Sequence, residues 1–236
     1  MTGEPSIAVV ADNIRRGATI RVRDIQIFDS RLDRVVGEIQ RYFAAQSQIN
    51  VYLTPPTKHG LALHFDTTDV FIVQCTGQKE WKIFSDYTHK IELPLIDTQW
   101  NSEIYKPQGA AETIVLTPGD VLYIPRGVMH EAFCTERESI HLTISIEPLT
   151  VADLLAREIR RIAAIDVDLR RRVPWTIDGD DSHWDELTKD VRQRVLKLAD
   201  EIDVREALKG ERNSFRQNPA ASASELESAI ASLSKL

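Results

Sequence analysis

Short β-rich runs separated by turn residues occupy the middle of this chain and limit the folds that it can adopt. The runs lie within about one hundred residues and read INVYL, LALHF, DVFIVQC, EWKIF, TIVL, VLYIP and HLTISI in chain order. Turn sequences such as Pro55-Pro56 and Pro118-Gly119-Asp120 separate several of them, as connections between strands require. Many short strands with frequent turns predict a sandwich or barrel, because these architectures bury one face of each strand.

Other periodicities precede the β-rich region. Residues 18–28 alternate apolar and other side chains, which predicts one or two short extended segments. From Asp29 to Gln46 the apolar residues recur at helical spacing, with Asp29 or Ser30 as a candidate N-cap. This segment is therefore predicted to be an amphipathic helix.

The pattern changes again after Pro148, where apolar residues recur three or four apart over 151–163 and 187–203. Two helices are therefore expected to follow the barrel. The small polar residues beyond them predict a flexible linker before a short terminal helix. The predicted domains are a β domain with its N-terminal helix at 1–148, a helical domain at 149–212, and the linker with its terminal helix at 213–236.

Composition excludes several classes of protein. The chain has 29 Lys and Arg residues against 36 Asp and Glu residues, a formal charge of −7, so direct nucleic-acid binding is not expected. Two cysteines, Cys75 and Cys134, are too few for a disulfide-stapled secreted scaffold and favour a reducing cytoplasm. The chain shows neither an export signal nor an apolar run long enough to span a membrane. We therefore expect a cytoplasmic protein with no membrane association.

Three residues carry the types and order of a metal site. His64 and Asp66 stand two apart in a run that reads as a strand, so both side chains are expected on one face. Such a pair by itself is a weak signal, because it is more often part of a polar strand face in solvent. The segment TPGDVLYIPRGVMH, residues 117–130, adds His130 after two turns and an apolar strand. Two histidines and one carboxylate are the set that binds non-haem Fe(II) and leaves positions open.

The layout G-D-x-x-x-x-P-x-G-x-x-H in that segment resembles the second motif of the cupin, or double-stranded β-helix, superfamily. Together with NVYLTPP, HFDTTDVFIVQCTGQKEWKIF and HLTISI, it is similar to the JmjC-type ribosomal oxygenases, which hydroxylate ribosomal proteins. The resemblance covers roughly residues 15–147 and continues more loosely to about residue 205. It implies a mainly β fold: a double-stranded β-helix (cupin/JmjC jelly roll) followed by an α-helical C-terminal segment.

The resemblance also implies Fe(II), 2-oxoglutarate and O₂ as cofactor and cosubstrates. The implied metal ligands and catalytic residues are His64, Asp66 and His130. The implied 2-oxoglutarate-binding residues are Lys79, Ser145, Asn50, Tyr52 and Thr143. The residue types fit this role, because the distal carboxylate of 2-oxoglutarate needs a cation and hydroxyl donors in a desolvated pocket. The local sequence alone allows other interpretations. Lys79 could be a turn lysine and Tyr52 a core residue. Ser145 and Thr143 could be ordinary strand residues, and Asn50 could cap a turn.

The resulting hypothesis is a 2-oxoglutarate-dependent hydroxylase acting on a protein or peptide side chain, either ribosomal-protein-like or a biosynthetic precursor. A homodimer through the C-terminal helices is expected, although their apolar stripes could also pack onto the same chain. Larger relatives carry a winged-helix-like domain after these helices, and only about thirty residues remain here. The alternatives are a cupin metalloprotein or enzyme without 2-oxoglutarate, another JmjC activity such as demethylation, and an inactive interaction module.

Overall fold

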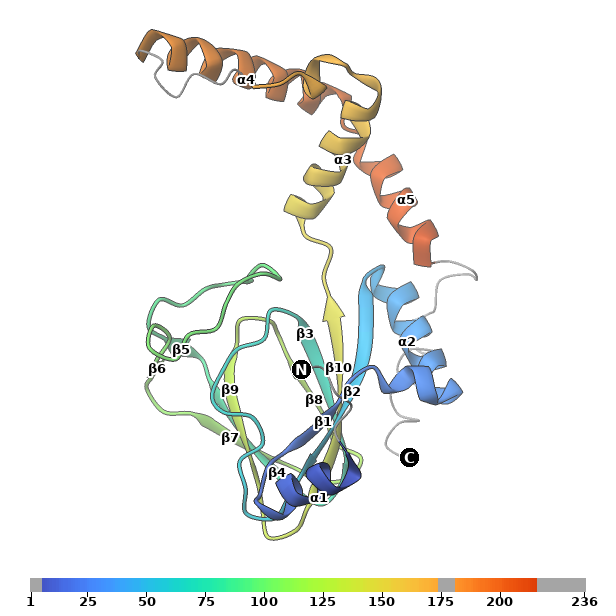
Figure 1. Ribbon diagram of the computed structural model, residues 1–236, viewed down its shortest axis with the longest axis vertical. Helices are drawn as coiled ribbons and strands as arrows, with labels where there is room; N and C mark the ends of the chain where they lie inside the picture. The colour runs from blue at the N-terminus through green and yellow to red at the C-terminus, as the bar shows by residue number, and fades with distance from the viewer. Residues whose placement is uncertain (1–5, 174–180, 216–236) are drawn as a thin grey trace. The chain divides into compact units, whose positions relative to one another are not determined.

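The computed structural model describes residues 6–173 and 181–215. The described residues form two compact units, one ending at Pro148 and the other beginning at Leu149. The first unit contains all of the described strands (Figure 1). Searched over the described residues, no helix combines the length and apolar character that crossing a membrane requires.

Two antiparallel sheets build the first unit. The larger sheet has the order β1-β2-β10-β3-β8 and the smaller one the order β7-β4-β9. The strands of the larger sheet are β1 (Ile20–Val22), β2 (Gln46–Thr54), β3 (Asp69–Thr76), β8 (Val121–Ile124) and β10 (Ser139–Glu147). The smaller sheet contains β4 (Lys79–Phe84), β7 (Glu112–Leu116) and β9 (Met129–Cys134), and a separate pair joins β5 (Asp86–Tyr87) to β6 (Pro107–Gln108). The predicted mainly β cupin fold is confirmed.

The main apolar core lies on the outer face of the larger sheet, beneath helix α2 (Ser30–Phe43). Asp29 accepts a hydrogen bond from the backbone N–H of Arg31, which caps the helix as the sequence predicts. Apolar residues three and four apart then form one buried stripe on α2. This cluster contains Leu32, Val35, Val36 and Ile39 of α2 with Ala45, Ile49, Val73, Leu142, Ile144 and Ile146.

The inner face of the same sheet is largely polar on β2 and β10, whereas Val70 and Ile72 of β3 belong to a second apolar cluster there. In the β2–β10 register His141 lies opposite Tyr52, and Thr143 lies opposite Asn50, so these side chains share one face. Thr54, two residues after Tyr52, is fully buried and contacts Lys79 of the smaller sheet through its hydroxyl. Hydrogen-bonding side chains from both sheets therefore meet inside the barrel.

One predicted strand is absent, and two short elements were not predicted. Leu61–Phe65 forms no named strand, and only an isolated bridge joins His64 to His130. The prediction of one or two short extended segments within residues 18–28 is confirmed by β1. A 3-10 helix, η1 (Ile25–Phe28), follows it, after Asp24 adopts a left-handed backbone that turns the chain. Strand β9, which carries His130, was not among the predicted runs. Its sequence MHEAFC mixes polar and apolar residues, so it lacks a continuous apolar signal.

Helices account for the remaining described elements. Helix α1 (Ile7–Arg15), capped by Ser6, opens the described chain. The second unit contains α3 (Val151–Ile165), η2 (Asp168–Arg170), α4 (Asp181–Glu201) and α5 (Val204–Phe215). The predicted helices at 151–163 and 187–203 correspond to α3 and α4.

The prediction missed α5, which continues to Phe215 and thus beyond the expected start of the linker at residue 213. Ile162 of α3 and Leu198 of α4 are the buried apolar residues of these two helices. The predicted terminal helix lies outside the described residues.

Candidate active site

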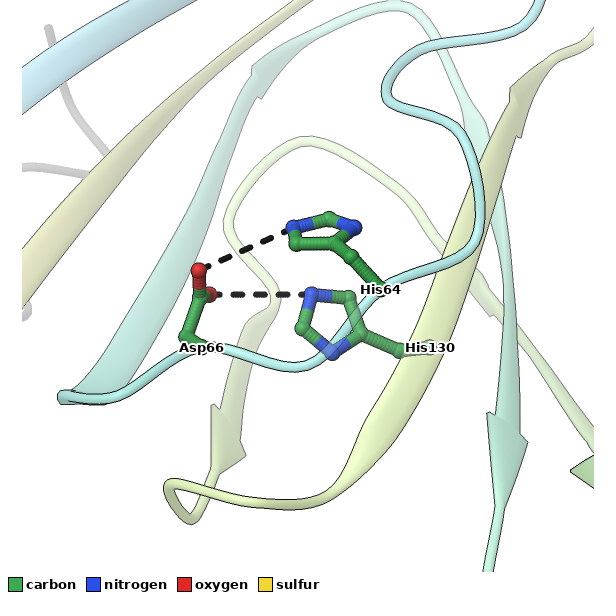
Figure 2. A group of neighbouring side chains, drawn as sticks. All are labelled: His64, Asp66 and His130. Carbon is green, nitrogen blue, oxygen red and sulfur yellow. Dashed lines mark ion pairs between the residues drawn. The ribbon is translucent and has the colours of Figure 1, made fainter. Parts of the chain in front are cut away.

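His64, Asp66 and His130 converge on one point, as Figure 2 shows. The Nε2 atom of His64 lies 3.6 Å from Oδ1 of Asp66, and Nε2 of His130 lies 3.7 Å from Oδ2. One ligand atom from each residue falls within 4.8 Å of the others. The three side chains could therefore hold a single metal ion, as two histidines and a carboxylate do in non-haem iron sites.

Hydrogen bonds fix the orientation of both imidazole rings. Nδ1 of His64 lies 2.7 Å from the carbonyl oxygen of Ala62, and Nδ1 of His130 lies 2.9 Å from that of Val128. A carbonyl oxygen can only accept, so Nδ1 carries the hydrogen in each ring. The Nε2 atoms face the carboxylate, and in the neutral tautomer with hydrogen on Nδ1 they carry the lone pair that metal binding requires.

Backbone contacts and an aromatic cluster hold the irregular segment that carries two of these residues. His64 and His130 exchange both backbone N–H···O bonds, at 3.0 and 2.7 Å. Phe65, between the two candidate ligands, is buried and makes edge contacts with Trp100 and Tyr105 at 5.2 and 5.1 Å between ring centroids. The aromatic contacts thus set the direction of the flanking side chains without a regular strand.

The electrostatics of His130 favour metal binding. Its side chain is 3% exposed, and burial together with the neighbouring His64 lowers its pKa to about 4. His130 is consequently neutral at neutral pH, and no proton must be displaced before the imidazole binds a metal.

Lys79 places a buried ammonium group in the same pocket. The residue is 1% exposed, and its Nζ donates to Oγ1 of Thr54 at 2.9 Å and lies 3.3 Å from Nδ1 of His141. Burial lowers its pKa to about 8. Within the described ranges no carboxylate forms an ion pair with Lys79. An ammonium held inside a protein without a counter-charge is costly, so this arrangement is typical of a site that receives an anion.

One pocket joins the two features, because the three candidate metal ligands and Lys79 line it together. Its lining combines residues of both sheets with residues of the segment before β3. They are Tyr52, Leu61, His64, Asp66, Ile72, Lys79, Trp81, His130, Ala132, His141 and Thr143.

The predicted ligand-binding residues separate into two groups. Lys79, Tyr52 and Thr143 line the pocket, whereas Ser145 and Asn50 are not among its lining residues. The Ser145 hydroxyl donates to the backbone of Gln48 at 3.5 Å. Asn50 Oδ1 accepts from the backbone N–H of Asp24 at 3.2 Å. The roles predicted for Ser145 and Asn50 remain predictions that no contact with the pocket supports.

Sequence reasoning missed two residues that contact the ammonium. Thr54 stands two after Tyr52 and four after Asn50, so strand periodicity would have put it on the same face. Gly60 also abuts Lys79, since a Cβ atom built there would lie 2.8 Å from Nζ. No sequence pattern marks that approach, because it depends on how the segment before His64 crosses the barrel.

The fold and these side chains define the class of the protein: a cupin-fold protein with a candidate metal site beside a buried cationic pocket. Residues 22–154 match the family described as the JmjC domain. The matched segment spans more than half of the chain and includes all three candidate metal ligands. The chain therefore belongs to the JmjC family, and the predicted similarity to the ribosomal oxygenases is confirmed by the relatives below.

Curated relatives include Ribosomal oxygenase 1 of Danio rerio, 37% identical over 139 residues, which are 58% of this chain and 25% of the relative. A bifunctional lysine-specific demethylase and histidyl-hydroxylase, NO66 of Dictyostelium discoideum, is 32% identical over 67% of this chain and 31% of its own length. Among solved structures, the ribosomal oxygenase YcfD of Escherichia coli aligns with a TM-score of 0.52 at 18% identity, covering 86% of this chain and 52% of YcfD. The chain thus spans about a third or less of these two curated relatives.

Proposed function

We propose that this chain is an Fe(II)- and 2-oxoglutarate-dependent oxygenase that hydroxylates a side chain of a protein or peptide. The observation that carries the proposal is the buried Lys79 ammonium, which pairs with no carboxylate among the described residues and lines the same pocket as the three candidate metal ligands. A cupin that uses only a metal would need the ligands but not this buried charge.

The three candidate ligands fit Fe(II). Each presents a nitrogen or oxygen atom, and the set leaves other coordination positions free. Asp66 completes the set with a negative charge, which also lowers the net charge of the bound ion. Fe(II) with 2-oxoglutarate and O₂ would supply the oxidising power for attack on a C–H bond.

The chain's own residues would bind, orient and shield the cosubstrate. An ammonium offers three N–H donors, and Lys79 uses two of them toward Thr54 and His141. The third donor remains for a ligand carboxylate. Trp81 is 5% exposed and lines the pocket, and its ring lies 5.8 Å from Nζ of Lys79 and 5.9 Å from the ring of His130, so it would shield the ligand from water. A charge-assisted hydrogen bond is stronger in such a desolvated place.

The names of the relatives support a protein substrate. One is called a ribosomal oxygenase and another a lysine-specific demethylase and histidyl-hydroxylase. We propose hydroxylation of a ribosomal-protein-like or precursor-peptide side chain. The net charge of −7 favours association with a basic polypeptide over an acidic one.

We also propose a homodimer through the helical unit. Val191 and Val195 lie four apart on α4 and are 49% and 56% exposed, so one helix face presents apolar surface to a partner. Sedimentation at several protein concentrations tests this, and a monomer at all of them would contradict it.

Anaerobic titration with Fe(II) and 2-oxoglutarate tests the central proposal. We expect a weak visible charge-transfer band that is absent from Asp66→Ala and retained by the control Asp97→Ala, whose carboxylate is exposed. Absence of the band from the unaltered protein would refute the proposal.

Mass spectrometry of ribosomal proteins and peptides incubated with the enzyme then identifies the reaction. A gain of one oxygen atom indicates hydroxylation, whereas loss of a methyl group indicates demethylation.

A further inference from the structure

His141 lies against the buried lysine and has the features of a fixed hydrogen-bond acceptor. It is 2% exposed, and its Nδ1 atom lies 3.3 Å from Nζ of Lys79. Its ring is stacked on Tyr52 at 4.9 Å between centroids with an angle of 2° between the planes. The ring of Trp81 meets it edge-on at 5.5 Å and 81°. Aromatic contacts from two strands therefore hold the imidazole in a single orientation.

The chemistry of the two side chains assigns their roles. Lysine in its ammonium form can only donate, so Nδ1 of His141 must carry the lone pair and the ring must be neutral. Burial, together with the nearby Lys79 charge, holds the pKa of His141 well below its usual range. Neutral His141 accepts a hydrogen bond without adding a negative charge.

Because His141 is an uncharged acceptor, it leaves the Lys79 charge available to a ligand. A carboxylate in the place of His141 would neutralise Lys79 and compete with an incoming anion for the ammonium. A neutral acceptor instead aligns one N–H of the ammonium and leaves the positive charge available. Thr54, whose Oγ1 also accepts from Lys79 and contacts Thr19 Oγ1 at 3.1 Å, directs a second N–H in the same way.

We infer that His141 is a positioning residue: its neutral Nδ1 and the Thr54 hydroxyl together direct the remaining N–H of Lys79 toward the distal carboxylate of the cosubstrate. The inference rests on the proposed function, in which that cosubstrate is 2-oxoglutarate. His141 itself need not touch the cosubstrate or the metal. It determines selectivity for an oxoacid that carries a second carboxylate.

Two substitutions separate the acceptor from the aromatic ring. His141→Phe keeps a flat ring stacked on Tyr52 but removes the acceptor. His141→Asn removes the ring but can place its amide oxygen near the position of Nδ1. The dissociation constants of 2-oxoglutarate and of 2-oxobutyrate, which lacks the distal carboxylate, are measured for each variant by anaerobic titration with Fe(II). Binding of Co(II) alone, followed by its visible absorption, is measured in parallel.

We expect His141→Phe to weaken 2-oxoglutarate binding about tenfold, since a hydrogen bond that orients a charged group is lost. Binding of 2-oxobutyrate and of Co(II) should stay within about twofold of the unaltered protein, because neither needs the ammonium. His141→Asn should recover most of the preference for 2-oxoglutarate. This restoration distinguishes a positioning role from simple packing.

The results that would contradict the role of His141 differ from those that would contradict the proposed function. Unaltered 2-oxoglutarate binding in His141→Phe, or an equal loss of both oxoacids and Co(II), would overturn the role of His141 and leave the proposed function intact. An unaltered protein that binds both oxoacids equally would instead overturn the proposed function. Nitrogen NMR of His141 in the unaltered protein needs no variant: the neutral ring with hydrogen on Nε2 supports the inference, and hydrogen on Nδ1 overturns it.

Discussion

Replacing Lys79 by methionine should remove a pH dependence from the stability of the ligand-free protein. Burial lowers the pKa of Lys79 from its usual 10.5 to about 8. Each pKa unit corresponds to ~1.4 kcal/mol, so the folded chain holds this charge at a cost of about 3 kcal/mol below pH 8. Methionine has a similar length and no charge, and it avoids that cost.

The direction of the pH effect follows from where the proton is released. The folded chain loses the Lys79 proton near pH 8, whereas the unfolded chain keeps it until about pH 10.5. Between these values the unfolded state binds more protons, so folding becomes more favourable as pH rises. From pH 7 to pH 9.5 the gain is about 2 kcal/mol for the unaltered protein, and Lys79→Met should lack it.

Part of the benefit of methionine at neutral pH is offset elsewhere. Lys79→Met leaves Nδ1 of the buried His141 without its donor, which costs about 1–3 kcal/mol. Thr54 keeps its contact with the Thr19 hydroxyl. The net stabilisation at pH 7 is therefore expected to lie between about 0 and 2 kcal/mol, and the change with pH is the sharper measurement.

Urea unfolding of the metal-free protein at pH 7 and pH 9.5 measures this change. The free energies of unfolding of the unaltered protein and of Lys79→Met should converge or cross as pH rises. Lys106→Met, which removes an exposed ammonium, is the control and should run parallel to the unaltered protein. Parallel behaviour of Lys79→Met as well would refute the argument that Lys79 is a buried, uncompensated charge.

Three further measurements follow from the same geometry. The affinity for 2-oxoglutarate should fall up to about tenfold per pH unit above pH 8, because the ligand binds the ammonium form of Lys79, whose pKa is about 8. Equal affinity at pH 7 and pH 9.5 in calorimetric titrations would contradict this. Gly60→Ala should weaken 2-oxoglutarate binding severalfold while sparing Co(II), since its Cβ would lie 2.8 Å from Nζ of Lys79; unchanged affinity would show that the ammonium can move freely. Phe65→Ala should destabilise the protein by about 3–5 kcal/mol and weaken Co(II) binding, because the segment from His64 to Asp66 loses its contacts with Trp100 and Tyr105. Denaturation with a parallel Co(II) titration measures both effects. Unchanged Co(II) affinity would contradict the argument that the aromatic contacts orient His64 and Asp66.

Local patterns sufficed for much of the fold because they report on burial. The apolar stripe of α2 and the alternation of β2 and β10 mark faces that pack against a core, and both predictions matched the structure. The segment at Leu61–Phe65 did not, since its side chains are held by the aromatic cluster and a single bridge to His130. Residues distant in the sequence determine that conformation, so local alternation could not predict it.

The candidate site was predictable as a set of residue types but not as a set of contacts. His64, Asp66 and His130 converge as their order suggested. The surroundings of Lys79 depend on the pairing of β2 with β10 and on how β4 faces them. That register brings Thr54 and His141 to the ammonium, and it leaves Ser145 bonded to the backbone of β2. The alternation of side chains along a strand shows which residues share the inner face. Which of these residues contact Lys79 depends on the register between the strands.

The two faces of the larger sheet differ in composition, which explains how the fold remains stable with a buried charge in its pocket. Its outer face and α2 bury a continuous apolar cluster, which supplies the hydrophobic stabilisation of folding. The inner side of β2 and β10 is then free to carry groups that reduce stability, and Lys79 reaches it from the smaller sheet. Because the cluster under α2 shares no residue with the pocket, substitutions in the two regions should have additive effects on stability. A double variant that combines Ile39→Val with Lys79→Met tests this, and a free energy of unfolding that departs from the sum by more than about 0.5 kcal/mol would show that the faces are coupled.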